Sequence, residues 1–242
     1  GLIDPGELLL ACGTAWVYSG AELNPDPATL PSSLDLNYHL YPERWIISQS
    51  LGGLGASLAW WLKETWGGSD EKRYTVLDEA LQTTKPNEEL FFLPMTGGHD
   101  NPATIQPGGF VGLGLHHRRA DMARAVMESA GYELRWALDN LENAGTQVNS
   151  LTMVGGAADS TVWPTLIANI TGLPIYLPQY DNWPALGAGL LAGTGTGLFS
   201  NLDEGMERFQ KSSQMIAPQT ECKTLYQACF LEYQQVFKMV RE

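Results

Sequence analysis

Three short glycine-containing segments hold the residues of this sequence that best suit the binding of an anion or a flat ring. The first is Gly13-Thr14 in "LACGTAWV", and the second is Gly55 in "GGLGAS". The third is 155–158, "GGAA", within "LTMVGGAADSTVWPTLIANITGLPIYLP". Backbone N–H groups in a turn or at a helix start can hold a phosphate without any lysine, and glycine lets a ligand approach the backbone closely.

Each segment also has an ordinary structural explanation. Gly13-Thr14 can be the turn of a hairpin, and Gly55 can simply precede a helix. Residues 155–158 can form a tight strand-to-helix turn, with the helix capped by Asp159 or Ser160. Taken singly, none of the three segments decides between a binding site and a turn.

The hydrophobic patterns predict the elements that would position these segments. Strands are expected at 7–12 and 15–20, joined as a hairpin, and within 34–48, 90–93, 109–115 and 151–178. Helices are expected within 51–66, 74–84, 118–145, 185–199 and 224–241, and inside 151–178 after the glycines. Strand–helix alternation in the second half and hairpins in the first half predict an α/β fold with a mixed sheet.

The composition excludes some classes of partner. The 242 residues carry a formal net charge of −13, which opposes non-specific binding to nucleic acid and to an anionic membrane. Cys12, Cys222 and Cys229 form no CxxC pair and have no metal-ligand spacing. This favours a reduced, cytoplasmic setting and predicts no metal site. No apolar run reaches membrane-spanning length.

The first residues of the chain favour a piece of a longer protein. The sequence has no initiator Met, and the turn Asp4-Pro5-Gly6 leads directly into an apolar strand. The alternative is a processed start.

Two other patterns are expected to be structural. "GAGLLA", 187–192, matches a relaxed dinucleotide pattern but follows "DNWPA" instead of a strand, so we expect a closely packed helix. His99 and Asp100 in "GGHDNP" are adjacent, so their side chains should point apart. We expect them to be solvated loop residues rather than an acid–base pair.

Five segments in order carry a resemblance to a known family. They are "LACGTAWV", "GASLAWWL", "RADMARAVMESAGYELRWALDNL", "MVGGAADSTVWPTLIANITGLPI" and "ALGAGLLAGTGTGLF". Together they make the chain resemble the C-terminal domain of the FGGY carbohydrate kinases, and the xylulokinases in particular. The resemblance covers essentially all of 1–242. It implies the actin-like, ribonuclease-H-like ATPase fold, with this chain as the second lobe.

The resemblance also implies a nucleotide site. Gly13 and Thr14 would meet the terminal phosphates of ATP, and Gly55 would lie near the ribose and the α-phosphate. Gly156 and Ala157 would line the adenine pocket, and Ser160 would face the base or the ribose. The residues assigned to the nucleotide are thus Gly13, Thr14, Gly55, Gly155, Gly156, Ala157 and Ser160.

The implied reaction is transfer of the ATP γ-phosphate to a sugar hydroxyl with Mg²⁺, and D-xylulose is the best match. The general-base aspartate is expected just upstream of Gly1, so no catalytic residue is assigned in this chain. The sugar would be held mainly by an N-terminal lobe that this chain lacks. The chain alone should bind ATP or ADP weakly and turn over no sugar. A homodimer is left open.

Several departures from the family pattern keep alternatives open. "GGHDNP" stands where many members have G-E-R-x-P, "GTAW" replaces the commoner G-T-S, and Ala59 stands where some members have Gln. One alternative is another kinase of the family, such as a ribulokinase, glycerol kinase or gluconate kinase. The other is a non-catalytic pseudokinase lobe.

Overall fold

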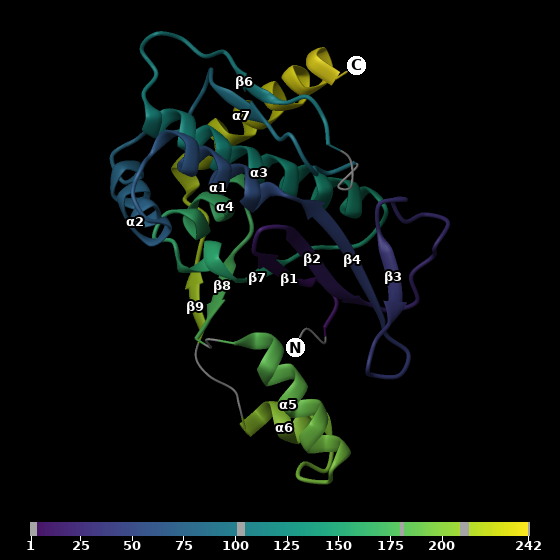
Figure 1. Cartoon of the computed structure of the whole chain (residues 1–242). Coiled ribbons are helices and arrows are strands. Elements are labelled where there is room, and N and C mark those ends of the chain that lie inside the picture. The colour runs from purple at the N-terminus through teal and green to yellow at the C-terminus, as the bar shows by residue number, and fades with distance from the viewer. Residues whose placement is uncertain (1–3, 101–104, 180–181, 209–212, 242) are drawn as a thin grey trace.

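A seven-stranded mixed sheet forms the centre of the computed structural model, which describes residues 4–100, 105–179, 182–208 and 213–241. Its strand order is β3-β4-β2-β1-β7-β8-β9 (Figure 1). β7 runs parallel to β1 and to β8, and the other neighbours pair antiparallel. The strands are β1 Glu7–Cys12, β2 Trp16–Glu22, β3 Asp35–Tyr38, β4 Trp45–Gly52, β7 Ser150–Val154, β8 Ile175–Pro178 and β9 Ser213–Ile216.

The first strand shows how the sequence assigns the two faces of the sheet. Side chains alternate between faces along a strand, and Leu8, Leu10 and Cys12 of β1 are buried. Leu9 and Ala11, which lie between them, are only half-buried and face the opposite side. The buried set belongs to the main core.

Helices cover the face on which that core lies (Figure 1). They are α1 Leu54–Thr65, α2 Asp70–Leu81, α3 Arg119–Asn143, α4 Trp163–Thr171 and α7 Thr220–Arg241. The longest expected helix, 118–145, is confirmed as α3, and Gly145 follows its end with φ +98°. A mixed sheet flanked by helices was expected and is confirmed. The edge strand β9 was not expected.

A small second sheet lies outside the helical layer (Figure 1). It consists of β5 Phe91–Leu93 and β6 Gly109–Val111, paired antiparallel. β6 is shorter than the expected 109–115 strand because the next residue, Gly112, has φ +83° and turns the chain. The Phe110 ring packs edge-on against Trp61 of α1 at a centroid distance of 5.0 Å.

The opposite side of the sheet carries a separate pair of helices (Figure 1). α5 Trp183–Gly195 and α6 Leu202–Arg208 pack against each other around the buried Phe199. α5 confirms the expected helix over the small-residue segment. Within the described part of the chain, none of the helices combines the length and the apolar character needed to cross a membrane.

Candidate functional site

The three glycine-containing segments meet at one cleft of about 690 Å³. It lies where β1 and β7 end and α1 begins, and α2 forms its other wall. Six of the seven residues assigned to the nucleotide line this cleft: Gly13, Thr14, Gly55, Gly156, Ala157 and Ser160. Residues of different segments, 41 to 147 positions apart in the chain, thus line one cleft.

The hairpin tip and the start of α1 are in direct backbone contact. The Ala56 N–H donates to the Thr14 carbonyl at 3.0 Å. A Cβ at Gly55 would lie 2.1 Å from the Gly13 carbonyl oxygen, so only glycine allows this approach. The Gly13 N–H donates to the Ala15 carbonyl, and the Thr14 side chain is exposed in the cleft. The start of α1 and the exposed Thr14 hydroxyl therefore lie side by side, and a helix start beside a hydroxyl is suited to phosphate.

The two glycines of the 155–158 turn have different tasks. Gly155 has φ +93°, and a Cβ there would lie 2.8 Å from the Cys12 carbonyl oxygen. Gly155 does not line the cleft, so a glycine is needed at this position to let the turn lie close to β1. Gly156 does line it, and a Cβ there would meet no described heavy atom within 4 Å. Open space beside a glycine is what a planar ligand needs.

The hydroxyl of Ser160 is engaged in the protein itself. It accepts hydrogen bonds from the N–H groups of Val162 (3.2 Å) and Trp163 (3.1 Å), at the start of α4. It donates to Oδ1 of Asp78 at 2.9 Å. The expected cap by Asp159 or Ser160 is wrong, because Val162 is the N-cap of α4 and makes no side-chain capping bond; the Ser160 hydroxyl binds the N–H groups of Val162 and of the first helical residue from outside the helix. Facing the base or ribose remains a prediction, and the hydroxyl would have to exchange or share these bonds to do so.

No motif in the sequence pointed to α2 as a wall of the cleft. Asp78 and Glu79 lie in the cleft together with Gln82, but the 74–84 segment shows only a short helical pattern without a motif. Asp78 could have been found only from its partners on the 160–161 turn, which lie 82 and 83 residues away. Short-range spacing carries no information about such pairs.

The cleft is acidic. Asp78, Glu79 and Asp159 line it, whereas none of its described lining residues is Lys, Arg or His. An anionic ligand therefore has to be held by backbone amides, by the helix dipole of α1 and by any cation that it brings with it. Among the described residues, no three His, Cys, Asp or Glu side chains come together as a metal site.

The cysteine in the cleft should be unreactive. Burial raises the pKa of the Cys12 thiol well above its ordinary value, and burial also raises the pKa of Cys229 to about 11. We expect iodoacetamide at pH 8 to modify the partly exposed Cys222 first in the native protein, because the thiolate is the reacting form. Mass spectrometry should find all three thiols modified in urea. Fast native alkylation of Cys12 would contradict its burial.

The expectation for His99 is wrong. His99 is only 6% exposed, whereas Asp100 is exposed as expected. The imidazole stacks on Trp136 at a centroid distance of 3.7 Å, and its Nδ1 lies 2.7 Å from Oε2 of the fully buried Glu133. The loop bends inward because the buried Glu133 carboxylate needs hydrogen-bond donors. The sequence alone does not show that Glu133 is buried.

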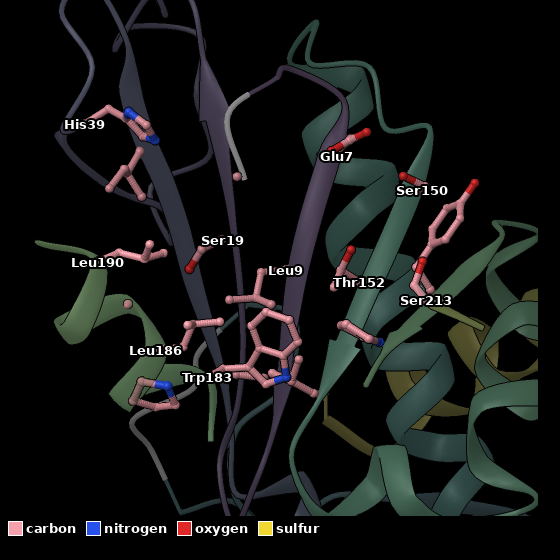
Figure 2. A pocket seen from close by; sticks show the side chains of 18 residues that line it. Glu7, Leu9, Ser19, His39, Ser150, Thr152, Trp183, Leu186, Leu190 and Ser213 are labelled. Carbon is pink, nitrogen blue, oxygen red and sulfur yellow. The ribbon is translucent and has the colours of Figure 1, made fainter. Parts of the chain in front are cut away.

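A second cavity, of about 730 Å³, lies on the other side of the sheet (Figure 2). Leu9 and Thr152 line it from β1 and β7, and Trp183, Leu186 and Leu190 line it from α5 (Figure 2). The "GAGLLA" segment thus lies on α5 beside this apolar cavity and away from the cleft.

Comparisons with known proteins agree with the fold. A family model for "FGGY family of carbohydrate kinases, C-terminal domain" matches residues 9–196. The chain is 30% identical to a xylulose kinase of Staphylococcus epidermidis over 249 residues, covering 100% of this chain and 49% of that protein.

Solved structures of sugar kinases also superpose on nearly the whole chain. The xylulose kinase of Rhodospirillum rubrum superposes with a TM-score of 0.86 at 23% identity, covering 99% of this chain and 48% of that one. The gluconate kinase of Lactobacillus acidophilus superposes with a TM-score of 0.80 at 26% identity, covering 98% and 48%. The chain therefore spans about half the length of the relatives that it matches.

Proposed function

Because this chain belongs to the FGGY family of carbohydrate kinases, we propose that residues 1–242 form the ATP-binding domain of a sugar kinase. The full-length protein would transfer the γ-phosphate of ATP to a sugar hydroxyl. The observation that carries this proposal is the meeting of Gly13-Thr14, Gly55 and the Gly156 turn at one cleft with open space beside Gly156. D-xylulose is the preferred acceptor, since a xylulose kinase aligns over the whole chain.

The residues of this chain would bind and orient the nucleotide. The start of α1 and the exposed Thr14 would hold the phosphates, because the helix dipole favours negative charge there. The base would lie against Gly156 and Ala157, opposite α2. Positioning and charge stabilisation account for most of the catalysis of phosphoryl transfer, so a rigid cleft of this kind is a substantial contribution.

Mg²⁺ fits this site as a companion of ATP. A cleft lined by acids and lacking lysine or arginine among its described residues would repel a bare polyphosphate, and Mg²⁺ neutralises that charge. Mg²⁺ is commonly held by substrate phosphates and one or two carboxylates. We propose that these carboxylates, the general base and most of the sugar contacts lie in the half of the protein outside this chain.

The apolar side of the sheet would pack against that other half. α5 has no charged residue, and Ala185, Ala188 and Leu191 on it are exposed. An uncharged helix is normally buried, and the cavity beneath it is lined mainly by apolar side chains (Figure 2). Since the matched relatives are about twice as long as this chain, the other half supplies enough chain to cover this surface.

The test is ADP release by the full-length protein with Mg-ATP and one sugar at a time: D-xylulose, D-ribulose, L-ribulose, glycerol or gluconate. We expect turnover on D-xylulose, and this chain alone should bind ATP weakly and release no ADP. Preference for another acceptor would favour a different kinase of the family, as the likeness to a gluconate kinase allows. ATP binding without turnover on any acceptor would favour a pseudokinase. Absence of ATP binding would overturn the proposal.

A further inference from the structure

One carboxylate joins the two walls of the cleft. Oδ1 of Asp78 accepts from the Ser160 hydroxyl at 2.9 Å. Oδ2 accepts from the Thr161 N–H at 2.7 Å and from the Thr161 hydroxyl at 3.2 Å. Both carboxylate oxygens are therefore bound to the turn that follows Gly156, although Asp78 itself belongs to α2.

Each end of this connection is fixed to the core. On α2, the neighbouring Leu77 and Leu81 are 1% and 2% exposed, which anchors the helix and holds Asp78 on its cleft side. On the turn, the Ser160 hydroxyl also accepts from the first amides of α4. Trp163, in the first turn of α4, is buried against Trp16 of the sheet at a centroid distance of 5.1 Å. The carboxylate thus links two anchored elements across an open space.

The linked elements are the ones between which a ligand would fit. Gly156 and Ala157 line the cleft on the turn side, and Tyr74, Thr75 and Gln82 line it on the α2 side. Hydrogen bonds donated to a carboxylate are among the stronger ones in proteins, and the Asp78 carboxylate accepts three of them. Asp78 therefore holds the 160–161 turn to α2 at the cleft.

We propose that Asp78 is a positioning residue for the nucleotide: it holds the 156–161 turn at the distance from α2 that the adenine side of ATP requires. This inference rests on the proposed function. Without the tether, α2 and α4 would stay on the core, but the 160–161 turn between them would lose its three hydrogen bonds to Asp78 and could shift, and ATP would have to restore its position on binding. The cost would appear in ATP affinity, because the sugar and the chemical step belong to other parts of the protein.

The test uses the full-length protein with Asp78→Ala and Asp78→Asn. We expect Asp78→Ala to raise the KM for ATP by roughly tenfold, with kcat and the KM for the sugar changed by less than about threefold. Asp78→Asn, which keeps one acceptor oxygen, should lie between Asp78→Ala and the wild type. Asp203→Asn is the matched control, because Asp203 accepts from the Tyr41 hydroxyl on an exposed helix far from the cleft and should leave all three constants unchanged.

The outcomes separate this inference from the proposed function. A wild-type protein that binds no ATP would overturn the proposed function itself. A wild type that binds ATP, with an unchanged KM in Asp78→Ala, would overturn only the positioning role. A parallel loss in kcat, in both KM values and in melting temperature would also overturn it, since that pattern means general destabilisation.

Discussion

Gly156→Trp is expected to raise the KM for ATP of the full-length protein by a factor of roughly 30 or more, at a nearly unchanged melting temperature. A side chain at position 156 would enter the cleft, because a Cβ there meets no described heavy atom within 4 Å. The backbone at Gly156 does not need positive φ, so the substitution adds no backbone strain. The indole would therefore compete with the ligand for space and leave the core intact.

The neighbouring Gly155 supplies the matched control. Gly155→Ala puts a Cβ 2.8 Å from the Cys12 carbonyl oxygen at a residue with φ +93°. We expect it to lower the free energy of unfolding by about 2 kcal/mol or more, with or without nucleotide. Gly156→Trp should thus weaken nucleotide binding without loss of stability, and Gly155→Ala should lower the stability of the fold.

Isothermal titration with ADP and thermal unfolding of the same samples measure both effects. Unchanged ADP affinity in Gly156→Trp would mean that the nucleotide lies elsewhere. A large fall in the melting temperature of Gly156→Trp would mean that the open space is needed by the fold.

Glu133→Ala is expected to lower the free energy of unfolding by about 3–5 kcal/mol, a large part of the stability of an ordinary domain. Glu133 is fully buried in α3, and its carboxylate accepts from the His99 N–H at 2.8 Å, from the His99 ring and from the Tyr233 hydroxyl. The chain of bonds continues through Gln49, whose Nε2 donates to the His99 carbonyl at 2.8 Å and whose Oε1 accepts from the Tyr18 hydroxyl at 2.8 Å. Removing the carboxylate leaves several buried donors without an acceptor.

Urea unfolding followed by tryptophan fluorescence measures this effect. Glu142→Ala, an exposed carboxylate on the same helix, should change the free energy of unfolding by no more than about 0.5 kcal/mol. Glu133→Gln should be intermediate, because the amide oxygen can replace one accepting oxygen but its NH₂ group opposes another donor. A Glu133→Ala protein as stable as the wild type would show that water or a shifted loop satisfies these donors.

The sequence alone determined the local parts of this protein. Glycine turns between apolar runs predicted the hairpin at Gly13-Thr14, the start of α1 and the strand–turn–helix at 155–158, and all three are confirmed. Strand–helix alternation in the second half and hairpins in the first half predicted a mixed sheet flanked by helices. The solved relatives confirm the actin-like fold that the resemblance implied. The glycine turns and the elements beside them depend on residues within a few positions of one another, so a single sequence contains the information for them.

Only the tertiary structure decided which side chains meet. It separated Gly155, which allows close packing against Cys12, from Gly156, which leaves the cleft open. It placed Asp78 on the 160–161 turn, and it buried His99, which was expected in solvent, against Glu133. The hydrogen-bonded pairs among these join residues 34 to 83 positions apart. Their contact follows from how helices pack on the sheet, because a buried carboxylate must find donors wherever the packing brings them.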